Sequence, residues 1–409
     1  MSLSKTKRQV VTLYGSSLLG ILTGVFVSIL NTSNLPPVEY GDVRYINNFI
    51  SFFSGILLFG YFVSGSRLLA LSKSKEETRR LKGILTTILL TTFATMMVIM
   101  VVCGVIHGSI LHKEYSYLFY TAIPVCGSVL FLNYINTTSQ GDNNINAIAA
   151  ARLFPSLIYL VVAYLIYRYY GASRERMILL HNGIAMIFLL FLILKARPDF
   201  SHLRESWKIL NEENKKYGLQ VYYGSLANVS VQYVAGITLG LFGTNNANVG
   251  YYTLALTVSM PLTMLPQVVG TTYFKRFASE DRISPKVIKY TVLITLLSYI
   301  LFVLAIHPII RLLYKPEYIS VAYFATLLGI GCVLNGLGDV FNRFLGAHGK
   351  GVYLRNGAFI SGGVALVGYT LMVYLFDIHG AIATRIISTL VYCLMMVYYY
   401  KKMTNVQLI

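Results

Sequence analysis

The chain has 409 residues, of which 56% are hydrophobic and only 12% are charged, against roughly 25% charged residues in an ordinary soluble domain. This composition excludes a soluble globular protein. The formal net charge of +18 suggests nucleic-acid binding, but basic residues of membrane proteins gather on the cytoplasmic side and explain the charge without a nucleic-acid partner.

Apolar runs of about 20 residues recur along the whole chain, and each is long enough to cross a bilayer core of about 30 Å. We therefore predict an all-α polytopic membrane protein with twelve spans and no separate soluble domain. The basic start of the first run, with no cleavage site after it, predicts an uncleaved anchor. The expected spans are 9–31, 43–71, 83–106, 115–138, 145–168, 177–194, 217–242, 249–273, 287–310, 319–344, 351–376 and 378–400.

The distribution of Lys and Arg predicts the topology. With the N-terminus inside, 26 of the 34 basic residues fall in cytoplasmic segments, seven fall in outside loops, and Arg385 lies within the last span. Arg152 is counted here with the cytoplasmic residues. This asymmetry predicts cytoplasmic N- and C-termini in the inner, or plasma, membrane.

The chain also contains an internal repeat. Tyr223-Gly224-Ser225 repeats Tyr14-Gly15-Ser16 after 209 positions, and in each copy a glycine, Gly41 or Gly250, follows 26 positions later. We interpret Gly250 as a turn residue. The repeat predicts two six-helix bundles, residues 1–194 and 217–409, with the substrate site expected between them.

The longest polar segment, 195–216, joins the two predicted bundles. It contains the only tryptophan, Trp207, in an amphipathic pattern with Leu203 and Leu210. We predict a short helix that lies on the inner membrane surface as a hinge, in preference to a protein-docking site.

Polar side chains within spans are costly, and their placement is therefore informative. Asn48 in the second span and Asn228 and Gln232 in the seventh lie on stripes of polar or small residues. Small residues on such stripes favour tight helix packing. The long amides favour a water-filled cavity, with Arg44 and Asn48 facing Asn228 and Gln232 across it.

The eighth span contains Pro261 and Pro266, which predict a kink with freed carbonyl groups beside Gln267. Arg67, Arg276 and Arg343 mark cytoplasmic span ends, where they serve as topology charges or, together, as phosphate ligands. The candidate substrate-binding residues are thus Arg44, Asn48, Arg67, Asn228, Gln232, Gln267 and Arg276.

Few other charges lie within the spans. Asp339 is the one acidic residue deep in a span, and Arg343 follows it at i+4, so we expect a local ion pair, with gating as the alternative role. Arg385 lies about two turns into the twelfth span, where snorkelling or pairing with Asp377 is expected.

Signals for an enzyme, a metal or a cofactor are absent. Residues 346–351 resemble a phosphate-binding loop only superficially, because the spacing is wrong and no strand precedes them. The four cysteines lie singly in apolar runs and fit neither a disulfide framework nor a metal site. We predict that the protein is not an enzyme and needs no cofactor.

Six segments in order resemble a known family over nearly the whole chain. They follow spans one, four and seven, precede and follow span ten, and open span twelve. They are 35–41 (LPPVEYG), Gln140-Gly141, 249–252 (VGYY), 313–318 (LYKPEY), 345–349 (LGAHG) and 378–384 (IHGAIAT). Together they resemble the polysaccharide-transporter branch of the multidrug/oligosaccharidyl-lipid/polysaccharide (MOP) exporter superfamily, and its Wzx-type O-antigen flippases in particular.

This resemblance implies a MATE-like fold of two six-helix lobes around a central cavity. It also implies movement of undecaprenyl-pyrophosphate-linked oligosaccharide from the inner to the outer leaflet by alternating access. Membrane lipids, a polysaccharide polymerase with its chain-length machinery, and a coupling ion (H⁺ or Na⁺) are the further partners it implies. Many relatives carry an acidic residue in span seven, whereas residues 232–235 here contain none, so ion coupling is not carried over from that position.

The residues independently favour a flippase for an anionic lipid-linked oligosaccharide, because the intramembrane charges are cation-rich and acid-poor. The first alternative is an ion-coupled drug or cation antiporter of the same fold, which needs acidic residues in its cavity. The second is a membrane glycosyltransferase or polymerase, which needs carboxylates in a large outer loop, and no outer loop is large.

Overall fold

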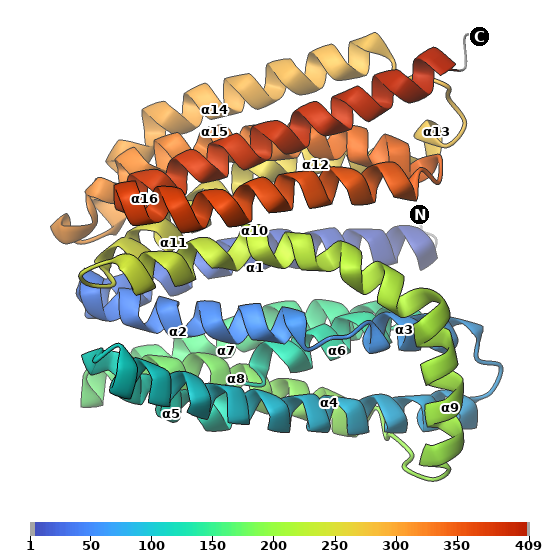
Figure 1. The fold of residues 1–409 in the computed structure, drawn as a ribbon, viewed down its shortest axis with the longest axis horizontal. Helices are drawn as coiled ribbons and strands as arrows, with labels where there is room; N and C mark the ends of the chain where they lie inside the picture. The colour runs from blue at the N-terminus through green and yellow to red at the C-terminus, as the bar shows by residue number, and fades with distance from the viewer. Residues whose placement is uncertain (1–4, 407–409) are drawn as a thin grey trace. The chain divides into compact units, whose positions relative to one another are not determined.

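The structure, a computed structural model, describes residues 5–406 apart from the side chains of 5–14, 16–18, 21, 227, 228, 230, 275, 405 and 406. Helices make up nearly all of the described chain, and no strand occurs in it (Figure 1). The chain divides into two compact units. Unit 1 comprises Met1–Leu35 and Ile46–Leu226, and unit 2 comprises Pro36–Tyr45 and Ala227–Ile409.

Unit 1 is arranged around α6, which contacts α3, α4, α7 and α8, while α1 packs along α7. Polar caps start three of its helices, because the side chains of Ser74, Asn144 and Ser173 accept hydrogen bonds from the first-turn backbone. Its helices are α1 (Lys5–Asn34), the second part of α2 (Pro37–Ile56), α3 (Tyr61–Leu71), α4 (Lys75–Val105), α5 (Tyr117–Ala122), α6 (Ser128–Gly141), α7 (Ile145–Tyr170), α8 (Arg174–Lys195), α9 (Leu203–Glu213) and the start of α10 (Leu219–Phe242).

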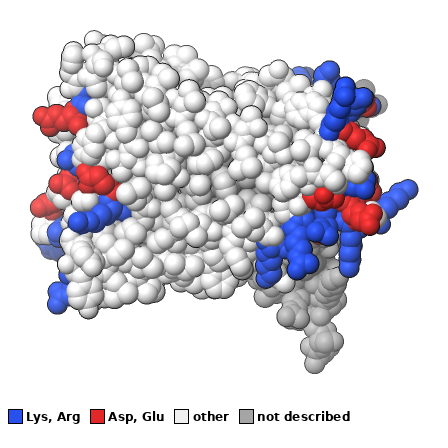
Figure 2. All heavy atoms as spheres, turned by 90° about the horizontal axis from the view of Figure 1, so that it is seen from below, with Lys and Arg blue, Asp and Glu red and all other residues white. Residues whose placement is uncertain are grey.

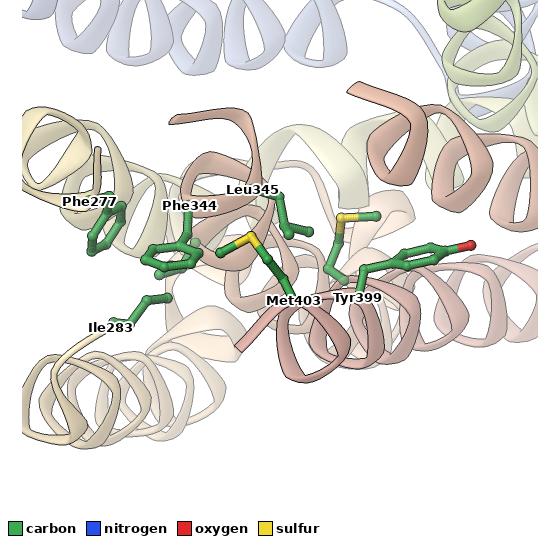
Figure 3. Close-up of a cluster of buried hydrophobic side chains, with 8 residues drawn as sticks. Phe277, Ile283, Phe344, Leu345, Tyr399 and Met403 are labelled. Atoms are coloured by element: carbon green, nitrogen blue, oxygen red, sulfur yellow. The ribbon is translucent and has the colours of Figure 1, made fainter. Parts of the chain in front are cut away.

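Unit 2 is arranged around α15, which contacts α11, α12, α14 and α16. Its helices are the start of α2, the second part of α10, α11 (Ala247–Ser259), α12 (Pro261–Thr272), α13 (Phe274–Phe277), α14 (Pro285–Leu313), α15 (Ser320–Ala347) and α16 (Gly351–Val406). At the end of unit 2 near the C-terminus, the buried side chains of Phe277, Ile283 and Phe344 point toward one another and join α13 and the start of α14 to α15 and α16 (Figure 3).

Long apolar helices make the chain a multi-pass membrane protein. Seven described helical segments are long and apolar enough to span a membrane, and the number rises to ten if each of three bent pairs is one span. The segment α16 counts once, although Asp377 interrupts it with non-helical backbone where spans 351–376 and 378–400 were expected to meet. Charged side chains gather at the two ends of the face shown in Figure 2 and leave an uncharged band between them. The total of twelve membrane spans stays a prediction.

Two predicted spans are bent. Pro261 bends α11 against α12 by 40°, which confirms the kink expected in span eight. We predicted one continuous span over residues 43–71, and this was wrong, because the chain bends by 57° between α2 and α3. Here Phe59 and Gly60 have positive φ, and the Asn214 side chain donates a hydrogen bond to the Phe59 carbonyl group. The signal for this break, the pair Phe59-Gly60, is weak in an apolar sequence.

Gly41 and Gly250 lie within helices, so our interpretation of Gly250 as a turn residue was wrong. A Cβ atom on Gly250 would lie 3.3 Å from the Gly41 Cα atom, so the two repeat-related glycines pack against each other. A Cβ atom on Gly41 would lie 1.8 Å from the Asn246 carbonyl oxygen. The glycines serve a close helix crossing, and this crossing places residues 37–45 of α2 in unit 2.

The helix expected between the two bundles is present as α9. It packs against α3 and α4, with the Trp207 ring 5.4 Å from the Tyr61 ring and an ion pair between Glu213 and Arg67. Leu210 is fully buried, whereas Trp207 and Ile209 are 39% and 48% exposed. These contacts fasten α9 to unit 1. Its role as a hinge on the membrane surface stays a prediction.

Candidate functional site

A cavity of about 430 Å³ lies in unit 1 between α1, α6, α7 and α8. Part of its lining is apolar, and the polar lining residues come from three of the four helices. They are Ser128 of α6, Arg152, Ser156 and Tyr159 of α7, and His181 and Asn182 of α8. Among the described residues that line it, Arg152 is the one with a full charge and none is acidic. Its size and its few convergent polar groups are typical of a ligand site.

Asn182 of this cavity forms hydrogen bonds to two neighbouring helices. Its oxygen accepts a hydrogen bond of 2.8 Å from Ser128, and its amide nitrogen donates to Asn47 at 2.9 Å. The asparagine is 4% exposed and links α8 to α6 and to the second part of α2. Because both ends of the amide are bonded, Asn182 fixes the positions of the lining helices.

Tyr159 forms the inner wall. Its hydroxyl group donates to the Asn31 side-chain oxygen at 2.6 Å and lies 3.0 Å from the Tyr167 hydroxyl group. Its ring meets the His181 ring edge-on at 5.1 Å. The network joins α1, α7 and α8 within the membrane-spanning segments, where polar groups need partners. It is a buried group of hydrogen-bonding side chains that the sequence analysis did not identify.

Arg152 is a site residue that the sequence analysis did not identify. We counted it only with the cytoplasmic charges, whereas in the structure it lies about two turns into α7 and its exposed side chain lines the cavity. A guanidinium group here offers a planar fork of donors that matches phosphate oxygens. Since Ser156 and His181 also line the cavity, it presents a hydroxyl group and an imidazole beside the cation, a set that suits an anion that also carries hydroxyl groups.

Two predicted site residues lie on α2, one in each unit. In unit 2, Arg44 donates from Nε to the Tyr40 hydroxyl group at 2.8 Å, and its guanidinium group lies 5.0 Å from the centre of that ring. In unit 1, Asn48 is half-buried, and its amide nitrogen is buried without a hydrogen-bond partner among the described residues. Substrate binding by either residue stays a prediction.

The cations predicted at span ends each have a carboxylate partner in their own unit. Arg67 is ion-paired with Glu213 and lies over the Tyr217 ring, and Arg276 is paired with Glu280 at 2.6 Å. Arg343 donates from Nε to Asp339 at 3.3 Å, so the expected local ion pair is present. These pairs offset the positive charge that a phosphate group would use, although the guanidinium groups keep further donors. Glu213 is 146 positions from Arg67, and the pairing was therefore invisible in the sequence.

Three amide residues of unit 2, Asn228, Gln232 and Gln267, were also predicted to bind substrate. The side chain of Asn228 lies outside the described residues. Gln232 of α10 is exposed and Gln267 of α12 is half-buried. That Arg44 and Asn48 face Asn228 and Gln232 across a cavity stays a prediction.

Arg385 of α16 forms no ion pair with Asp377 among the described side chains, and Asp377 instead accepts a hydrogen bond of 2.7 Å from Asn248. Instead, Arg385 donates to the Val231 carbonyl group at 3.3 Å, and its Nε atom is buried without a partner among the described residues. Both expectations for this residue, snorkelling and pairing with Asp377, are therefore wrong. The hydroxyl groups of Tyr252 and Tyr369 lie beside each other in the same unit, 3.5 Å apart.

No family model matches the sequence, and no curated protein matches it. Solved structures do match in fold. An inward-facing multidrug-resistance MATE-family transporter of the MOP superfamily matches with a TM-score of 0.70 and 16% identity, covering 95% of both chains. The lipid II flippase MurJ in an inward closed conformation matches with a TM-score of 0.69 and 14% identity, covering 96% of this chain and 87% of that one.

A MOP-superfamily transporter from Pyrococcus furiosus, described as having a binding pocket of reversed polarity, also matches. Its TM-score is 0.52 at 15% identity, over 97% of this chain and 96% of that one. Identities this low establish the fold alone. The protein therefore has the all-helical fold of MATE-type transporters of the MOP superfamily.

Proposed function

We propose that the protein is a flippase that moves an undecaprenyl-pyrophosphate-linked oligosaccharide from the inner to the outer leaflet of the bacterial inner membrane. Its fold is shared by transporters and by a lipid flippase, which supports a transport function. In this proposal the site moves its substrate without chemical change, both termini are cytoplasmic, and the two units alternate in access. A polysaccharide polymerase with its chain-length machinery would receive the product.

One observation carries the substrate class: the unit 1 cavity has Arg152 as its one fully charged lining residue and no carboxylate among its described lining residues. A guanidinium group attracts a phosphate group and repels cations. The Ser156 hydroxyl group and the His181 imidazole beside it suit the hydroxyl groups of a sugar. An anionic glycolipid headgroup offers both.

The same observation weighs against the main alternative. An antiporter of organic cations needs negative charge where its substrate binds, and the described lining of this cavity supplies none. We therefore place the cation antiporter second. A coupling ion, H⁺ or Na⁺, stays a prediction.

Deleting the gene tests the function in the native host. We expect the deletion strain to accumulate lipid carrier that bears one complete oligosaccharide unit, with the sugars shielded from reagents that cannot cross the membrane. Mass spectrometry of extracted lipids measures the sugar, and periodate oxidation of intact spheroplasts measures its leaflet. If the accumulated carrier bore a truncated sugar, the protein would be a transferase and the proposal would fail.

A further inference from the structure

We propose that unit 2 carries a binding groove for one anionic phospholipid, between α12 and the first turns of α14. The groove has a volume of about 630 Å³. One wall is formed by apolar residues of α12 such as Leu265, Val268 and Val269, and the other by α14 from Lys286 to Thr295. The stretch from 284 to 295 gives it a length of about 16 Å along the helix axis.

The groove has two chemically different ends. At the start of α14, its lining includes Arg276, Ser284 and Lys286. Further along α14, the lining is apolar except for the Tyr290 hydroxyl group and for Thr291 and Thr295. The hydroxyl groups of the two threonines each donate a hydrogen bond of 2.7 Å to a carbonyl group of their own helix. These threonines therefore add no donor that needs a partner. A polar head and a hydrocarbon tail match the two ends.

The charge at the basic end fits a single negative charge. Glu280 accepts a hydrogen bond from Arg276 and raises the pKa of that guanidinium group further above its usual range. Lys286 is exposed and has no carboxylate within 4 Å among the described side chains. One net positive charge remains, which complements the phosphodiester of a phospholipid better than it complements a pyrophosphate. Lys286 also lies in the first turn of α14, where the helix dipole favours an anion.

The packing in Figure 3 holds this basic end in place. Phe277, next to Arg276, is fully buried, and Ile283, next to Ser284, is 2% exposed. The backbone N–H of Ile283 also donates to the Tyr400 hydroxyl group at 3.2 Å. The backbone on either side of the phosphate position is thus anchored to α15 and α16, as a preformed site requires.

The lining also indicates that the occupant comes from the membrane. Val268, Tyr290 and Ile294 line the groove and remain 44%, 59% and 50% exposed, so the groove is open along its length. Apolar side chains exposed on spanning helices face lipid tails. A soluble anion would touch only the basic end and leave the apolar walls unused. We therefore assign the groove to a phospholipid such as phosphatidylglycerol.

Lipid retention by the purified full-length protein tests this assignment. In nanodiscs with equal phosphatidylglycerol and phosphatidylcholine of the same chains, native mass spectrometry should show wild-type protein retaining about fivefold more phosphatidylglycerol. Lys286→Ala should lose this preference, and Val268→Trp, which fills the groove without changing its charge, should reduce retention of both lipids. Lys289→Ala and Arg282→Ala, which remove exposed charges outside the lining, should match wild type.

Each contrary outcome overturns the assignment. Equal retention of the two lipids by wild type, or an unchanged preference in Lys286→Ala, would show that the groove is not a site for an anionic phospholipid. An equal loss of the preference in Lys289→Ala would show that the general surface charge, and not the groove, retains the anionic lipid. Stronger retention of polyisoprenyl phosphate than of phosphatidylglycerol assigns the groove to the carrier lipid, and displacement by inorganic phosphate assigns it to a soluble anion. The measurement needs no transport, so its result is independent of the flippase proposal.

Discussion

Changing Arg152 to Gln should lower the rate of oligosaccharide export by about 10- to 100-fold, because it removes the charged lining residue of the unit 1 cavity. A hydrogen bond between charged groups contributes roughly 1.5–3 kcal/mol, which corresponds to that range. The export rate of Arg152→Lys should fall between those of wild type and Arg152→Gln, since an ammonium group keeps the charge but lacks the planar fork. Surface polysaccharide per unit of membrane-inserted protein measures the effect.

Arg168→Gln is the matched control. Arg168 lies on the same helix, is exposed, and does not line the cavity. We expect it to export at the wild-type rate, so a loss specific to Arg152 cannot come from the total charge of α7. Full export by Arg152→Gln at a normal amount of protein would remove the cavity from the transport path.

Gly41→Ala should remove most of the folded protein from the membrane. The added Cβ atom would lie 1.8 Å from the Asn246 carbonyl oxygen. Asn246 cannot easily retreat, because its side chain donates a hydrogen bond of 2.8 Å to Asp42 one residue after the glycine. Overpacking of a rigid helix crossing costs about 3 kcal/mol. Thermal unfolding in detergent, followed by size-exclusion chromatography of a fluorescent fusion, measures the loss.

Gly224→Ala controls for the general effect of glycine on helices. Gly224 is the other repeat-marker glycine of the second copy, and a Cβ atom there meets nothing within 4 Å. Alanine favours a helix over glycine, so this variant should be as stable as wild type or slightly more so. Equal stability of Gly41→Ala and Gly224→Ala would contradict the close crossing.

Much of the fold was predictable because bilayer thickness imposes a length on apolar helices. The kink at Pro261 and the break at Asp377 fall where proline and a predicted span boundary placed them. The break at Phe59-Gly60 was not predictable, because it depends on Asn214, which is distant in the chain. Gly41 and Gly250 show the same limit: glycine serves both turns and close helix crossings, and only the partner distinguishes the two.

The site was harder to predict because charges acquire their roles from distant partners. The local pair Asp339–Arg343 followed from i+4 spacing, whereas the pair Arg67–Glu213 required the fold. Arg152 was missed because its distance from the helix start resembled that of a topology charge. A signal was available, since Arg152, Ser156 and Tyr159 recur at intervals of three or four and share one face of a helix.

Reconstitution into liposomes tests the central claim most directly. Undecaprenyl-pyrophosphate-linked oligosaccharide is incorporated in both leaflets, the outer-leaflet sugars are removed by an external glycosidase, and the newly exposed sugars are measured over time. We predict that wild-type protein exposes the protected sugars within minutes, that Arg152→Gln does so at least about 10-fold more slowly, and that Arg168→Gln matches wild type. Failure of folded wild-type protein to expose them, under either pH or Na⁺ gradient, would contradict the proposed flippase.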